Sequence, residues 1–241
     1  GMLAIMVLSI VYALYGEVGF VAALFFGLKA AVLAIVLQAV VRIGGRALRN
    51  ATMRGIAAVS FLAIFAFAIP FPVIVLGAGL LGYLMARGGR LAFSGGSGHS
   101  AAGGAPVEDR ETLLGEGLPE HVRDGRRSSL KLGLVFLALW LLPVAALLLA
   151  LGPDSVFSRI AVFFSQMAVV TFGGAYAVLA YVAQEAVGGF GWLSPEEMLD
   201  GLGLAETTPG PLIMVTQFVG FLGALREAGD LHPLLAGTLG G

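Results

Sequence analysis

The sequence predicts an all-α protein, a polytopic transmembrane helical bundle in which some helices are broken or re-entrant. Hydrophobic residues make up 58% of the chain and charged residues only 12%, whereas soluble domains carry roughly 25% charged residues. Several apolar stretches are long enough to cross a bilayer, which takes about 20 helical residues. Glycine and proline interrupt two of them, and such breaks persist in lipid only where protein or a water-filled cavity satisfies the backbone.

The first apolar stretch, residues 2–15, is too short for a full span, so we expect the end of a helix there. Residues 20–41 predict a full span that contains Lys29, which we interpret as a side chain that snorkels to the membrane surface. Four arginines follow without an acidic residue among them: Arg42, Arg46, Arg49 and Arg54. Short loops rich in basic residues stay cytoplasmic, so this end of the span is expected to face the cytoplasm.

Residues 56–86 are apolar, but Pro70 and Pro72 divide them. Proline removes a helical donor and clashes with the preceding turn. The segment is therefore either one kinked span or a hairpin of two short helices, 56–69 and 73–85. Arg87 and Arg90 follow it, and basic residues on both sides favour the hairpin.

A polar segment then divides the chain into three predicted parts: a membrane module at 1–87, a flexible linker at 88–129 and a second membrane module at 130–241. The linker is rich in Gly, Ser and charge, a composition typical of flexible or disordered sequence. We expect at most a short helix near residues 108–117 within it.

The second module begins with a predicted span at 130–151 and continues with an apolar stretch at 156–187, which the first break divides. Ser194 and Pro195 predict a helix start, with Ser at the N-cap and Pro at N1; that short helix should run towards Asp200. A further helix is predicted at 212–225. Because both chain ends are abruptly apolar, we expect the chain to be a piece of a longer protein.

The second break contains the sharpest candidate site, formed by Thr207, Thr208, Pro209, Gly210 and Pro211. The prolines prevent helix before this point, and glycine lets a ligand approach the backbone. A helix that starts here would present free N–H donors and about half a positive charge. With the threonine hydroxyls, this arrangement predicts an oxyanion cradle; the alternative is an ordinary loop between helices.

Glu206 precedes this break, and an ionisable residue at membrane depth is a functional candidate by default. The carboxylate could couple solute transport to protons, or it could cap the helix. A charged Glu206 would repel an anion, which favours its protonation during transport.

The first break supplies the other candidate ligand residues, Phe172, Gly173, Gly174 and Tyr176. Adjacent glycines weaken a helix by about 1 kcal/mol each relative to alanine, so an unwound segment could contact a ligand here. The alternative is close helix packing through small residues.

Other polar residues receive less specific predictions. Gln184 and Glu185 are expected at the edge of a polar loop, and Gln166 and Gln217 either bond a neighbouring helix or line the solute path. The acids Glu196, Glu197 and Asp200 are expected to form a solvated helix face.

Several function classes lack any signal. The chain has no cysteine, and neither a metal-binding spacing, a nucleotide-binding loop nor a nucleophile with its base is recognisable. We therefore predict no enzyme activity, no metal and no cofactor. No basic face with interleaved aromatics indicates nucleic acid.

The motifs resemble those of the chromate ion transporter family. The runs FGGAYAVL at 172–179, DGLGLAETTPGPLIM at 200–214 and QFVG at 217–220 are similar to the second half of its long form, with GWL at 191–193 between them. Residues 24–49, including Lys29, resemble the later part of its first half.

This resemblance implies two homologous halves in opposite orientation in the cell inner membrane, and a multi-pass secondary transporter that exports chromate or sulfate, driven by the proton gradient. The anion would bind at the two breaks, with Glu206 as coupling carboxylate, and a homodimer would be the assembly to look for. The alternative from another class is a membrane scaffold or channel subunit in which the breaks serve packing.

Overall fold

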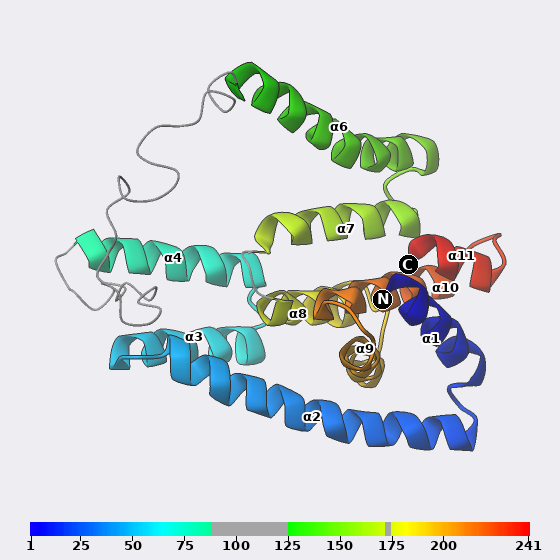
Figure 1. The fold of residues 1–241 in the computed structure, drawn as a ribbon, viewed down its shortest axis with the longest axis horizontal. Coiled ribbons are helices and arrows are strands. Elements are labelled where there is room, and N and C mark those ends of the chain that lie inside the picture. The colour runs from blue at the N-terminus through cyan, green and yellow to red at the C-terminus, as the bar shows by residue number, and fades with distance from the viewer. Residues whose placement is uncertain (88–124, 172–174) are drawn as a thin grey trace, which may run out of the picture.

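The computed structural model of this chain describes residues 1–87, 125–171 and 175–241, and within those ranges the regular structure is helical, with no strand (Figure 1). The predicted all-α fold is confirmed. The α-helices are α1 (Met2–Tyr15), α2 (Gly19–Ala47), α3 (Ala51–Phe67), α4 (Phe71–Arg87), α6 (Gly125–Leu151), α7 (Val156–Val170), α8 (Ala175–Ala183), α9 (Pro195–Thr207), α10 (Val215–Arg226) and α11 (Pro233–Gly240). A π-helix, η3 (Gln184–Gly189), extends α8, and a 3₁₀ turn, η4 (Leu212–Met214), precedes α10.

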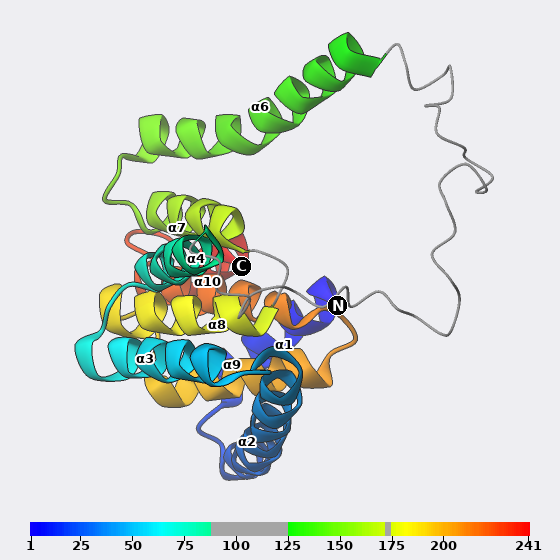
Figure 2. The same ribbon diagram turned by 90° about the vertical axis from the view of Figure 1, so that its left-hand side faces the viewer.

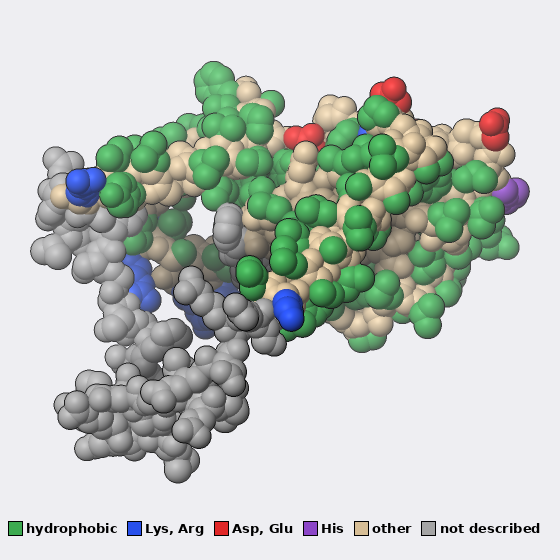
Figure 3. Space-filling view, turned by 90° about the horizontal axis from the view of Figure 1, so that it is seen from above, with side chains coloured by type: hydrophobic (Ala, Val, Ile, Leu, Met, Phe, Trp, Pro, Cys, Tyr) green, Lys and Arg blue, Asp and Glu red, His purple; other side chains and the backbone are tan. Residues whose placement is uncertain are grey.

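Two helices have the length and apolar composition of a membrane span: α2 and the Ser129–Leu151 part of α6. Large apolar side chains of α2, α3, α4 and α6 are exposed, and hydrophobic side chains cover much of the face in Figure 3. Such a surface belongs in contact with lipid or further protein. Together with the composition, it identifies an α-helical membrane protein.

The core lies in the C-terminal part of the chain (residues 125–241), between α7, α8, α9 and α10. Phe163, Trp192 and Phe218 are fully or almost fully buried there. The Phe163 and Trp192 rings meet edge to face with centroids 5.9 Å apart, and Phe190 stacks on Trp192 at 4.2 Å. These aromatic contacts fix the loop between η3 and α9. By contrast, α6 lies at the margin and packs on α7 (Figures 1 and 2).

Glycines let α10 and α11 approach until their backbones touch. A Cβ atom built on Gly220 would lie 2.2 Å from the carbonyl oxygen of Gly240, and one on Gly237 would lie 2.9 Å from the Phe221 ring. A larger residue at Gly220 would have to move the backbone of α11, and one at Gly237 would have to displace the Phe221 ring. Close approach through small residues is a common way to pack helices in membranes.

The N-terminal part of the chain (residues 1–87) packs on the C-terminal part through three helices. Helix α1 lies against α9 and α10, α2 crosses α9, and α4 contacts α8 (Figure 2). At the α2–α9 crossing, a Cβ atom on Gly203 would lie 2.5 Å from Leu28 Cγ and 3.3 Å from Val32. Because Gly203 has no side chain, the apolar residues of α2 pack directly against the backbone of α9.

The segment divided by Pro70 and Pro72 is a hairpin, as the flanking basic residues favoured. Helices α3 and α4 lie side by side, and Ala68 turns the chain in a left-handed conformation with φ of 48°. Gln184 satisfies the open backbone at this turn. Its amide donates to the carbonyls of Ala68 and Ile69, both at 3.0 Å, and its oxygen accepts the Phe71 N–H at 3.1 Å. Gln184, expected at the edge of the polar loop that follows it, thus bonds the turn between α3 and α4.

The bounds of other elements also differ from their predictions. Helix α2 continues to Ala47, past the predicted 41, so Arg42 and Arg46 lie within the helix and not in a loop after it. Helix α6 begins at Gly125, earlier than the predicted 130, and α9 continues past Asp200 to Thr207. Packing explains the longer α9, because Gly201 and Gly203 lie against Phe218 and Leu28, where any side chain would clash. The short helix predicted near 108–117 lies outside the described residues.

Candidate functional site

The second break opens between α9 and α10. Helix α9 ends at Thr207, Thr208 is extended with φ of −89° and ψ of 140°, and the chain resumes helical form at η4. Pro211 caps η4 without any side-chain hydrogen bond. No side chain therefore caps the amides at the start of η4 and α10. Uncapped amides are what allow a helix N-terminus to bind an anion.

The threonine hydroxyls of this break donate back to α9. Thr207 Oγ1 donates to the Gly203 carbonyl at 2.9 Å, and Thr208 Oγ1 donates to the Leu204 carbonyl. Both hydroxyl protons thus satisfy the last turn of α9 instead of pointing into the break. Glu206 lies in the same turn and is half-buried, so its carboxylate is at the negative end of the α9 dipole.

Pro209, Gly210 and Pro211 are exposed. A Cβ atom on Gly210 would lie 2.3 Å from Met214 Sδ, so a larger residue here would have to displace the flexible end of that side chain. A Cβ atom on Gly1 would also lie close to this sulfur, at 2.6 Å. The break is therefore a tightly folded turn with an accessible backbone.

The helix that follows the first break lies beside the second break. Phe172, Gly173 and Gly174 are outside the described residues, and Tyr176 belongs to the first turn of α8. Helix α8 resumes directly after the break and packs on η4. The chain thus brings the beginnings of two half-helices, separated by a long stretch of sequence, to neighbouring positions.

A cavity of about 270 Å³ adjoins η4 and the start of α10. Its lining includes Met214, Thr216 and Gln217, together with Gly240 of α11. Gln217, predicted either to bond a neighbouring helix or to line a path, lines this hollow. Gln166, predicted in the same terms, is exposed on α7.

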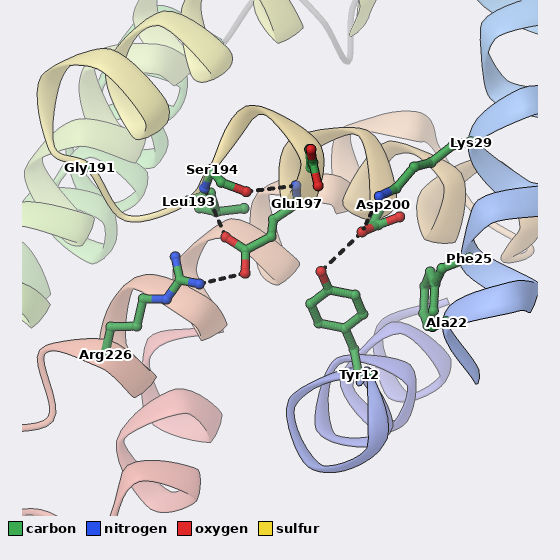
Figure 4. A pocket seen from close by; sticks show the side chains of 12 residues that line it. Tyr12, Ala22, Phe25, Lys29, Gly191, Leu193, Ser194, Glu197, Asp200 and Arg226 are labelled. Carbon is green, nitrogen blue, oxygen red and sulfur yellow. Dashed lines mark hydrogen bonds and ion pairs between the residues drawn. The ribbon is translucent and has the colours of Figure 1, made fainter. Parts of the chain in front are cut away.

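A larger polar cavity, of about 610 Å³, lies where α1, α2, α9 and α10 meet (Figure 4). Asp200 is its most buried charged residue, 3% exposed. Its Oδ2 accepts the Tyr12 hydroxyl at 3.0 Å and lies 3.3 Å from Lys29 Nζ. Burial raises the pKa of Asp200, and the Tyr12 and Lys29 contacts only partly oppose that rise.

Glu197 organises the other side of this cavity. It completes a capping box with Ser194: each residue's side chain accepts the other's backbone N–H, at 2.8 and 3.2 Å. Arg226 of α10 donates to Glu197 at 2.5 Å and to the Trp192 carbonyl at 2.5 Å. Burial alone would raise the pKa of Glu197, but the bonds from Ser194 and Arg226 outweigh it and lower that pKa.

Two predictions about this region are wrong. Asp200 and Glu197 are not a solvated face, because α1, α2 and α10 cover them; Glu196 is exposed as predicted. Lys29 reaches Asp200 instead of snorkelling to the surface. The sequence did contain a signal for this ion pair: Lys29 is alone within an apolar span, and a charge in that setting needs a partner.

The cavity holds two cations and three carboxylates and no recognisable nucleophile with its base. Within the described residues, no three His, Cys, Asp or Glu side chains gather as a metal site would require. The arrangement can bind and release protons and hold two helical layers together.

Comparison with known proteins identifies the chain's relatives. The family model described as "Chromate transporter" matches residues 1–83 and 158–241. The probable chromate transport protein of Synechococcus elongatus is 32% identical over 121 residues, 46% of this chain and 29% of that protein. The chromate transport protein of Pseudomonas aeruginosa is 39% identical over 87 residues, 35% of this chain and 20% of that protein.

The chromate transport protein of Cupriavidus metallidurans is 28% identical over 81 residues. The matched regions thus span less than a third of these relatives' lengths. No solved structure matches the chain.

Proposed function

This chain belongs to the chromate transporter family, and from that premise we propose that it serves a secondary transporter that exports a tetrahedral oxyanion, chromate first and sulfate second. We further propose a multi-pass location in the cell inner membrane. The N- and C-terminal parts would belong to two repeats of opposite orientation, which rock around the bound anion.

The observation that carries this proposal is the open backbone at residues 208–211. It lies at the uncapped start of η4 and α10, next to the start of α8. Helix N-termini attract anions through free amides and the helix dipole. The anion would bind the amides around Gly210 and, at the first break, those near Gly173 and Gly174. The hollow lined by Gln217 gives room beside the turn.

Glu206 is the proposed coupling carboxylate, acting in antiport with protons. Its position at the end of α9 puts a negative charge next to the proposed anion site. Protonation would remove that repulsion, so proton and anion occupancy would be linked.

The test combines Pro209→Ala with Gly210→Ala in the protein as its gene encodes it. Uptake of labelled chromate into inverted membrane vesicles should fall at least about tenfold. Alanine favours helix through the break, which would turn its amides away from the anion, and charged hydrogen bonds contribute about 1.5–3 kcal/mol each. The matched control is Pro143→Ala with Gly133→Ala in α6, where Gly133 has no neighbouring atom within 4 Å. Equal uptake by both double variants at equal membrane abundance would refute the site.

A protonophore separates the carrier from the alternative class. Chromate accumulation that collapses when the proton gradient is dissipated supports coupled transport. Flux that ignores the gradient indicates a channel subunit, and absence of flux in the unmodified protein indicates a scaffold.

A further inference from the structure

The oxyanion proposal leaves the large polar cavity without a role. Three of its residues, Tyr12, Lys29 and Asp200, form what we call the Asp200 cluster. They come from α1, α2 and α9, so the cluster joins the N-terminal part of the chain to the C-terminal part (Figure 4). A cluster at this junction is well placed to influence any motion between the two parts.

The two oxygens of Asp200 differ in their surroundings. Oδ2 receives both Tyr12 and Lys29, whereas the buried Oδ1 has no hydrogen-bond partner among the described residues. The side chain is 5% exposed. A buried ionised carboxylate oxygen without a donor is unfavourable, and a proton on Oδ1 would remove the buried charge.

The charges around Asp200 favour a proton over an oxyanion. Tyr12 faces it from α1, Lys29 from α2, Glu197 from one turn earlier on α9, and Arg226 from α10. Glu196 also lines the cavity, and Glu17 lines the adjoining hollow beside Tyr12. The lining of the cavity carries two cations and three carboxylates, so its formal charge is negative while Asp200 is ionised.

We infer that Asp200 is a proton-binding site that locks the two parts of the chain together when ionised and releases them when protonated. Ionised Asp200 holds the Lys29 ammonium and the Tyr12 hydroxyl on one oxygen. A proton on Oδ1 neutralises the carboxyl, ends the attraction to Lys29 and leaves that ammonium charged. The transport consequence rests on the proposed function, in which the two parts must move relative to each other.

Burial, which raises the pKa of Asp200, brings its protonation closer to physiological pH. Asp200 and Glu206 are separated by nearly two turns of α9 and have different neighbours. Asp200 would regulate the contact between the parts, and Glu206 the occupancy of the anion site.

The first test follows protonation without any substrate. Infrared titration of the protein in lipid should show a protonated-carboxyl band that titrates above the usual Asp range and is absent in Asp200→Asn. Lys29→Gln keeps the carboxyl but removes its cation, so the midpoint should rise by about one pH unit or more. Asp154→Asn, at an exposed turn, should leave this band unchanged. A band that survives in Asp200→Asn, or a midpoint that Lys29→Gln does not move, would overturn the inference.

The second test measures the lock itself. The chain contains no cysteine, so the pair Leu28→Cys and Gly203→Cys can report the α2–α9 contact. A Cβ on Gly203 lies 2.5 Å from Leu28 Cγ, and one further carbon–carbon bond of about 1.5 Å puts the two Cβ atoms within disulfide range.

At one fixed neutral pH, adding Asp200→Asn to this pair should slow disulfide formation several-fold, and adding Asp154→Asn should not. Equal rates in the two backgrounds would refute the lock. Neither the infrared titration nor the disulfide rate uses chromate. If both give the expected result and the transport assay fails, the failure counts against the proposed function and not against the proton site.

Discussion

Single side chains decide where α9 begins and which of its sides is buried. The sequence predicted the start at Ser194, because Ser, Pro and acids in that order form a local signal, and the capping box confirms it. It could not predict that Asp200 is buried. Asp200 lies one turn after Glu197, on a surface that α1 and α2 help to cover, and those helices are distant in sequence.

Glu197 offers a prediction about pH at this scale. Its pKa is lower in the folded protein, so its charge stabilises the fold at neutral pH, and this contribution disappears as pH falls through the folded pKa. Glu197→Gln should lower the unfolding free energy by about 0.5–1 kcal/mol at neutral pH, since the Arg226 pair is partly exposed. The two proteins should converge in acid.

Thermal unfolding in detergent at neutral and acidic pH measures this difference. Glu196→Gln, one residue earlier and exposed, is the control and should follow the unmodified protein throughout. A Glu197→Gln deficit that persists unchanged in acid would contradict the role of the charge.

At the scale of elements, breaks in apolar sequence were predictable and their partners were not. Pro70 and Pro72 left a kinked span and a hairpin as alternatives, because local sequence does not reveal what satisfies an open turn. The partner is Gln184, which is 113 residues from Phe71 and lies at the start of η3. The same limit applies to the second break, where the sequence located the turn but not the direction of the Thr207 and Thr208 hydroxyls.

Gln184→Leu should therefore loosen the α3–α4 turn. It removes the partners of two carbonyls and one N–H at a partly exposed turn, where the cost stays below the roughly 1–3 kcal/mol of a fully buried unmet group. With Ile69→Cys as reporter, labelling by a water-soluble maleimide should become several-fold faster. Gln38→Leu, at an exposed position on α2, should leave the rate unchanged; equal labelling in both variants would show that the turn holds without Gln184.

At the scale of the whole molecule, the sequence predicted two membrane modules, whereas their mutual packing required the structure. Composition and apolar length were sufficient for the helical membrane class and for the α2 and α6 spans. The close packing of α2 on α9 depends on Gly203. The sequence shows that a glycine is present in this helix but does not show which helix packs against it.

This packing predicts that the two parts associate without a covalent connection. Residues 1–87 and 125–241, co-expressed as separate chains, should co-purify through the contacts of α1, α2 and α4 with α8, α9 and α10. Gly203→Leu should greatly reduce the recovered complex by driving a side chain into Leu28. Gly133→Leu, in open space on α6, should not. Recovery that is independent of Gly203 would mean that the α2–α9 crossing contributes nothing.

The backbone contact between Gly220 and Gly240 has a mechanical consequence. With no side chain between them, α10 and α11 cannot roll or slide past each other without separating altogether. They therefore behave as one stiff unit, and the bend at residues 208–211 adjoins that unit beside the proposed anion site.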